Sequence, residues 1–150
     1  MKTQRMSKKV GNKTRSVKGK IYKYTPENIV TMFLQMLNTV KLYHWKTYSH
    51  SQHKATDELY SKLNSTIDTF VETMLGKTGG RVNLVKQKTL PLLAIENINN
   101  FKQEIAKYKN FLINMSKDSE LNTSSNSDLM NIRDEILGNL NQFTYLLTFK

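Results

Sequence analysis

The sequence predicts an all-α fold, a bundle of four long helices with one long connection between the second and the third. Apolar residues recur at helical spacing in four separate stretches. The alternation of apolar and polar residues that is typical of strands is missing. A stretch with three glycines and a proline, residues 76–92, divides the helices into two pairs. We therefore expect one helical domain over residues 25–150, preceded by a basic tail over residues 1–24.

The first two helices carry the clearest boundary signals. Thr25 can cap a helix over residues 26–47, and Pro26 suits its first position. A second helix is predicted after a short break around residues 48–51. It should end at Gly76, because glycine readily adopts the left-handed conformation that closes a helix.

The second pair of helices follows the long connection. Residues 76–92 are predicted to form a crossover that contains either a short helix or an extended piece. A third helix is expected over residues 93–117 and a fourth over residues 128–148, joined by a polar loop. Four helices with one long crossover in the middle form the ferritin-like arrangement.

The net charge of +11 is concentrated in the first 24 residues. This segment contains no acid and nine basic residues: Lys2, Arg5, Lys8, Lys9, Lys13, Arg15, Lys18, Lys20 and Lys23. Few of its side chains can pack, so we expect it to be disordered when free. A mobile polycation binds DNA without sequence preference, and DNA is the partner we predict. The alternatives are a solubilising tail and a contact with anionic lipid, although the apolar face of a membrane-docking helix is missing.

Other features narrow the chemistry and the location. The sequence has no cysteine, which excludes disulfides, thiolate metal sites and cysteine nucleophiles. The sequence has no apolar run of about 18 residues, which a transmembrane helix would need, so no membrane partner is expected. Because the apolar stretch of a secretory signal is also missing, we expect a cytoplasmic, DNA-associated protein. Histidine, aspartate and glutamate remain as metal ligands.

Candidate ligands gather on the second helix and at the end of the first. They are His44, His53, Asp57, Asp68 and Glu72. The last four fall within about 100° of one another on a helical wheel, so they share one side of the helix. Imidazole and carboxylate donors suit iron, and zinc or manganese could take the same site. The plain alternative is a solvated polar stripe.

The spacing of these residues favours a site shared between two chains. Asp57 and Asp68 lie about 16 Å apart along a helix, so they cannot hold one ion within the same chain. If two copies pack this helix antiparallel about a two-fold axis, His53 and Asp57 of one copy can meet Asp68 and Glu72 of the other. Such an interface creates two identical sites.

The pattern His-Trp at 44–45, followed from His53 by His-x3-Asp-x10-Asp-x3-Glu, resembles the Dps proteins. These are small ferritins that protect DNA during starvation. The resemblance is specific over residues 40–76. It implies a ferroxidase centre in which His44, His53 and Asp57 of one subunit bind iron with Asp68 and Glu72 of its neighbour.

The same resemblance implies a dodecameric cage that oxidises Fe(II) with peroxide or dioxygen, stores ferric iron and binds DNA through the basic tail. Trp45 would be a sink for oxidising equivalents or, more plainly, a core or interface aromatic. The interval from His44 to His53 is about one helical turn shorter than is usual in the family. His50 is therefore a candidate substitute or auxiliary ligand.

Two other functions remain open. One is a non-enzymatic, ferritin-like protein that packages DNA, inside a virion if the chain is viral; the richness in Lys, Asn and Ile suggests an AT-rich genome. The other is a plain four-helix module that binds an acidic partner.

Overall fold

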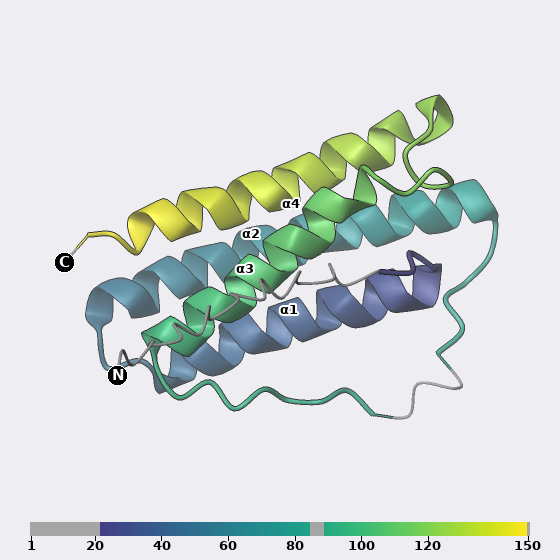
Figure 1. Ribbon diagram of the computed structural model, residues 1–150. Coiled ribbons are helices and arrows are strands. Elements are labelled where there is room, and N and C mark those ends of the chain that lie inside the picture. Colours follow the sequence, from purple (N-terminus) through teal and green to yellow (C-terminus); the bar gives the residue numbers. More distant parts are fainter. Residues whose placement is uncertain (1–21, 85–88, 150) are drawn as a thin grey trace, which may run out of the picture.

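Figure 1 shows the computed structural model, which describes residues 22–84 and 89–149. Within these ranges the chain forms four α-helices and a short 3-10 helix, and no strand. The helices are α1 (Pro26–Lys46), α2 (His50–Thr78), α3 (Ile98–Met115) and α4 (Ser127–Leu146), and the 3-10 helix η1 is Ser124–Asn126. The predicted all-α class is confirmed. None of the described helices is long and apolar enough to cross a membrane.

The helices pack in a ring in which α2 contacts α1 and α4, and α3 contacts the same two helices from the other side. The end of α1 meets the starts of α2 and α3 around Tyr43, Ser49 and Asn97. The end of α2 lies with the starts of α1 and α4, around Lys77 and Leu129. Consequently α2 and α3 run in the same direction, and the chain between them returns along the length of the helices (Figure 1).

The core between the helices is aromatic. Phe33 of α1 meets Phe70 of α2 edge to face, with ring centroids 5.2 Å apart. Tyr43 stacks on Phe101 of α3 at 4.1 Å. Met36, Met74 and Met115 are buried and Met32 is half-buried, so methionine side chains also fill this core.

The boundaries of α1 and α4 lie within two residues of the prediction, and the Thr25 hydroxyl accepts a hydrogen bond from the Asn28 amide at 3.3 Å. The predicted end of α2 is wrong. Gly76 lies inside the helix, which continues to Thr78 and closes at Gly79 with a φ of 67°. Gly79 takes the left-handed position because Lys77 and Thr78 can extend the helix, and glycine meets no steric penalty at positive φ.

The helix α3 begins five residues later than predicted, at Ile98. The Asn97 side chain accepts hydrogen bonds from the amides of residues 99 and 100 at 2.9 and 3.0 Å, which fixes this start. Ile95 is buried from the extended segment before the helix. The described parts of the connection contain no helix.

Two tyrosines that precede α1, Tyr22 and Tyr24, pack against α3. The rings of Tyr22 and Tyr24 lie 5.2 and 5.0 Å from that of Phe111 in α3. The Tyr24 hydroxyl donates to the Phe111 carbonyl at 2.6 Å. Lys23 is exposed. The other predicted DNA-binding residues, Lys2 to Lys20, lie outside the described residues.

Candidate metal centre

The centre is built at the connection between α1 and α2, where only Thr47, Tyr48 and Ser49 are non-helical. Gln52 holds this short connection in place, since its Oε1 accepts from the Tyr43 hydroxyl at 2.7 Å and from the Thr47 hydroxyl at 2.8 Å. As a result, the last turn of α1 lies directly against the first turn of α2.

This packing brings His44 and His53 together. Their imidazole rings stack with centroids 3.8 Å apart and 25° between their planes. The Nδ1 of His44 lies 3.1 Å from the carbonyl oxygen of His53, and the Nδ1 of His53 lies 3.0 Å from the carbonyl oxygen of His44. His44 is buried, with 7% of its surface exposed, whereas His53 is exposed.

The reciprocal hydrogen bonds assign the tautomer of both neutral rings. A carbonyl oxygen can only accept, so the proton of each imidazole must be on Nδ1. The Thr56 hydroxyl, 3.2 Å from the His44 Nδ1, is itself directed at the carbonyls of Gln52 and His53. Each Nε2 therefore keeps its lone pair. A carbonyl on the far ring nitrogen is the usual support of a histidine that binds a metal.

Asp57 lies one turn beyond His53. Its Oδ1 is 3.9 Å from the His44 Nε2, and its side chain is 67% exposed. Bonds from a zinc-like ion to nitrogen and oxygen are about 2.0–2.2 Å long, so one ion can reach two donors up to about 4.2 Å apart. The separation of the His44 Nε2 and the Asp57 Oδ1 falls within this range, and the His53 ring is stacked on that of His44.

A lysine of α1 also faces Asp57. The Lys41 Nζ lies 3.9 Å from the same Oδ1, and it is 4.8 Å from the ring centroid of Tyr60 and 5.7 Å from that of Trp45. Trp45 is 69% exposed, so the interpretation of Trp45 as a core aromatic is wrong. Its role at an interface stays a prediction.

Asp68 and Glu72 lie farther along the exposed side of α2. Asp68 lines a groove of about 360 Å³ between α1 and α2. The other lining residues are Val30, Phe33, Leu34, Leu37, Asn64, Ile67 and Val71. Asp68 thus lies beside apolar surface, as expected, instead of on a purely polar stripe.

The structure contains one chain, and in its described part no three histidine or acidic side chains converge closely enough to hold a metal ion. His44 stacks on His53 and lies beside Asp57, whereas Asp68 and Glu72 lie on another part of α2. Asp57 and Asp68 are too far apart along α2 to bind one ion within the same chain, so their separation is expected. The site shared between two chains stays a prediction. His50 is exposed at the first position of α2, outside the pair of histidines.

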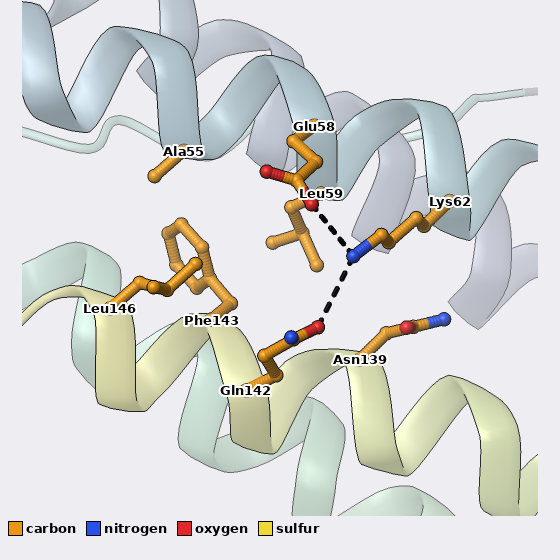
Figure 2. A pocket seen from close by; sticks show the side chains of 8 residues that line it. All are labelled: Ala55, Glu58, Leu59, Lys62, Asn139, Gln142, Phe143 and Leu146. Carbon is orange, nitrogen blue, oxygen red and sulfur yellow. Dashed lines mark hydrogen bonds and ion pairs between the residues drawn. The ribbon is translucent and has the colours of Figure 1, made fainter.

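Figure 2 shows the side of α2 that faces α4. Among the residues drawn there, no histidine lies beside an acidic side chain. There the Lys62 ammonium bridges the Glu58 carboxylate at 2.7 Å and the Gln142 side-chain oxygen at 3.2 Å. The cavity beside them, about 10 Å³, has room for no more than one water molecule. Glu58 pairs with Lys62 at the surface, and the less exposed Glu104 pairs with Lys107.

These features define an all-α protein in which two stacked histidines and a carboxylate lie where its first two helices meet. Residues 44–147 match a family described as a family of unknown function (DUF5856), and the chain belongs to this family. The matched range includes all five candidate ligands. No curated protein and no solved structure matches the chain.

Proposed function

We propose that this protein is a Dps-like mini-ferritin, a ferroxidase and iron store of the ferritin-like fold. Fe(II) is its substrate, bound between His44, His53 and Asp57 of one copy and Asp68 and Glu72 of a second copy. The observation that carries the proposal is the reciprocal hydrogen bonding of His44 and His53. It commits both Nδ1 atoms to carbonyl oxygens and so leaves each Nε2 for a ligand, and the His44 Nε2 lies 3.9 Å from a carboxylate oxygen of Asp57.

The outer face of α1 and α2 supports a second copy. Leu34 and Trp45 are 42% and 69% exposed on this face, and the groove beside Asp68 is lined mostly by apolar side chains. Covering exposed apolar surface favours association. In an antiparallel pairing about a two-fold axis, the same contact brings each Asp68 toward the other copy's Asp57. We propose that six such dimers form a dodecamer.

The proposed reaction balances with peroxide as the oxidant. Two Fe(II) ions each lose one electron, and one hydrogen peroxide molecule takes both electrons, together with two protons from the solvent, as its O–O bond breaks to give two waters. Dioxygen is the alternative oxidant. The protein supplies carboxylates that hold the cation, imidazoles with their lone pairs turned toward it, and a closed space for the ferric product. Zinc or manganese would bind the same donors without this chemistry.

The test is oxidation of Fe(II) by peroxide, followed by ferric absorbance. Asp68→Asn combined with Glu72→Gln should abolish the fast phase while leaving the helical content unchanged. The control, Glu58→Gln with Glu120→Gln, removes the same charge from exposed acids that are not among the proposed ligands and should react like the wild type. Fast oxidation that survives in the first variant would disprove the assignment of the site.

We propose further that the basic residues of segment 1–24 bind DNA without sequence preference, which places the protein in the cytoplasm on DNA, or inside the particle if it is viral. This proposal is supported by the charge of the segment, which is +9 because it has nine basic residues and no acidic residue. Removal of residues 1–20 should abolish a gel shift that weakens steeply with salt. If DNA is condensed but Fe(II) is not oxidised, the non-enzymatic packaging role is the correct one.

A further inference from the structure

A groove of about 310 Å³ lies where the start of α1, the end of α2 and the loop after α3 meet. This end of the bundle is on the right of Figure 1. The lining of the groove includes four apolar side chains and two acids: Ile29, Met74, Leu121, Leu129, Asp118 and Glu120. Such a groove suits a segment in which an apolar side chain lies between cations.

The two acids of this groove carry charges that the described packing does not neutralise. Among the described residues, no basic side chain forms an ion pair with Asp118 or Glu120. Lys77 also lines the groove, but its ammonium is bound to Asp128 at 2.9 Å and donates to the Ser125 carbonyl at 2.6 Å. The Asp118 carboxylate is held in place, since it accepts from the amides of residues 120 and 121 at 3.0 and 2.9 Å.

The basic tail joins the body beside this groove. Tyr24 lines the groove, and the ring of Tyr22 lies 6.1 Å from that of Tyr24. Both rings pack on Phe111, which holds the junction with the tail in position. A chain spans at most about 3.6 Å per residue, so the Cα atoms of Lys20 and Lys18 lie within about 7 and 14 Å of the Tyr22 Cα. The nearest cations of the tail are therefore confined to this end of the bundle.

The composition of segment 15–20, Arg-Ser-Val-Lys-Gly-Lys, complements the groove. Val17 can cover the apolar lining, and Arg15 and Lys18 on either side of it can pair with the two acids. The short tether to Tyr22 gives the segment a high local concentration at the groove. Exposed ion pairs are individually weak, so a competitor with many phosphates can displace the segment.

We propose that the groove binds residues 15–20 of the same chain and thereby competes with DNA for part of the basic tail. The inference rests on the proposed function, because it requires that segment 1–24 binds DNA. While the segment is in the groove, three of the nine tail cations are withheld from DNA phosphates. DNA binds the released form best, so its apparent affinity is reduced by the fraction of chains in which the segment is released.

The first experiment measures the Kd of the full chain for a DNA duplex by fluorescence anisotropy at one fixed, low salt concentration. Asp118→Asn with Glu120→Gln should lower the Kd about three- to tenfold, which corresponds to a segment that is bound in roughly 70–90% of wild-type chains. Loss of two acids also weakens the general repulsion of DNA. The matched control is therefore Glu58→Gln with Glu96→Gln, which removes the same charge from exposed acids at the other end of the bundle.

The control variant should bind DNA with nearly the wild-type Kd. Circular dichroism establishes that both variants are folded. An equal decrease of the Kd in the two variants would mean that only the net charge matters, and it would overturn the inference.

A second measurement locates the segment directly on the full chain. A carbodiimide joins a lysine amine to a carboxylate that it contacts, with loss of water, and mass spectrometry identifies the linked peptides. In the wild type, Lys18 or Lys20 should be linked to Asp118 or Glu120, and excess DNA duplex should suppress these links.

Links to the control acids in equal yield would overturn the inference. Links that form only between different chains would overturn it too, because the groove would then hold the tail of a second copy. A wild type that forms the expected links but binds no DNA would disprove the DNA binding proposed for the tail, while the occupant of the groove would stand.

Discussion

The imidazoles of His44 and His53 stack at 3.8 Å, and each donates its Nδ1 proton to the backbone carbonyl of the other residue. Two helices that are joined by three residues thus orient a pair of histidines with their own main chain. No carboxylate is needed to fix either tautomer, so Asp57 remains available as a ligand. The short interval between the histidines creates this arrangement.

The first prediction concerns the two imidazoles as ligands. His44→Ala and His53→Ala should each weaken Zn²⁺ binding by more than the roughly 10- to 100-fold that losing only a ligand's supporting hydrogen bond costs. His50→Ala should leave the affinity unchanged, because His50 is exposed outside the pair. Calorimetric titration measures all three, and equal losses in the three variants would point to a nonspecific charge effect.

The second prediction tests whether the centre is shared between copies. One variant carries His53→Ala with Asp57→Asn, and the other carries Asp68→Asn with Glu72→Gln. Neither should oxidise Fe(II) alone. After equal amounts are unfolded and refolded together, about a quarter of the wild-type activity should return, because half of the dimers are mixed and each has one intact site of two. Mixtures that stay inactive would contradict a shared centre.

The third prediction locates the interface. Leu34 on α1 is 42% exposed, and Leu34→Glu should dissociate the dimer and abolish Fe(II) oxidation without unfolding the chain, because a charge cannot be buried there unpaired. Ile113→Glu is the matched control, since Ile113 is 45% exposed on α3. Light scattering should show the wild-type assembly, about twelve times 17.4 kDa, only for the wild type and the control.

The fourth prediction concerns stability at high pH. Burial raises the pKa of Tyr108 to about 12, and its hydroxyl lies 2.6 Å from that of Thr39. An unfolded tyrosine loses its proton near pH 10. The unfolded state therefore holds fewer protons between pH 10 and 12, and the free energy of unfolding falls as the pH rises through this window.

Tyr108→Phe removes this contribution, so its free energy of unfolding should fall less steeply than that of the wild type between pH 10 and 12. Burial also raises the pKa of Tyr24, which leaves part of the slope in the variant. At pH 7 the variant should lose about 1 kcal/mol with the hydrogen bond. Urea unfolding at pH 7, 10 and 11.5 measures both effects, and parallel curves above pH 10 would contradict the assignment.

The fifth prediction compares two glycines of α2 and its cap, each with open space where the methyl group of an alanine would lie. Gly79 closes α2 at a φ of 67°, so Gly79→Ala should destabilise the protein by about 1–2 kcal/mol. Gly76 is inside the helix, where Gly76→Ala should stabilise by roughly 0.5–1 kcal/mol. Thermal unfolding reveals the opposite signs. The reverse pattern would mean that the helix ends at Gly76.

Most of the helical fold could be predicted because its signals are local. Thr25 followed by Pro26 indicates the start of α1, and the apolar spacing indicates all four helices. The errors fall where two local signals compete. Gly76 and Gly79 are both suitable caps, and the apolar residues around Ile95 continue the stripe of α3 although Asn97 begins the helix. Asn97 is a favourable cap by residue type, and the prediction, based on the apolar stripe alone, did not use it.

The candidate site was predictable only in part. Helical spacing placed His53, Asp57, Asp68 and Glu72 on one side of α2, and all four are exposed there. Spacing within one helix cannot reveal what a neighbouring helix brings to it. The approach of Lys41 to Asp57 depends on how α1 and α2 are packed, and the exposure of Trp45 depends on which side of α1 faces the core.

The sequence by itself determined the helices, the distribution of charge and the set of candidate ligands, because each depends on residues close together in the chain. Only the tertiary structure decided how His44 meets His53, since the three-residue connection acts through the packing of two helices. It also decided that Lys41 shares Asp57 with His44. Contacts between side chains of different helices arise from packing, and no periodicity along one helix contains them.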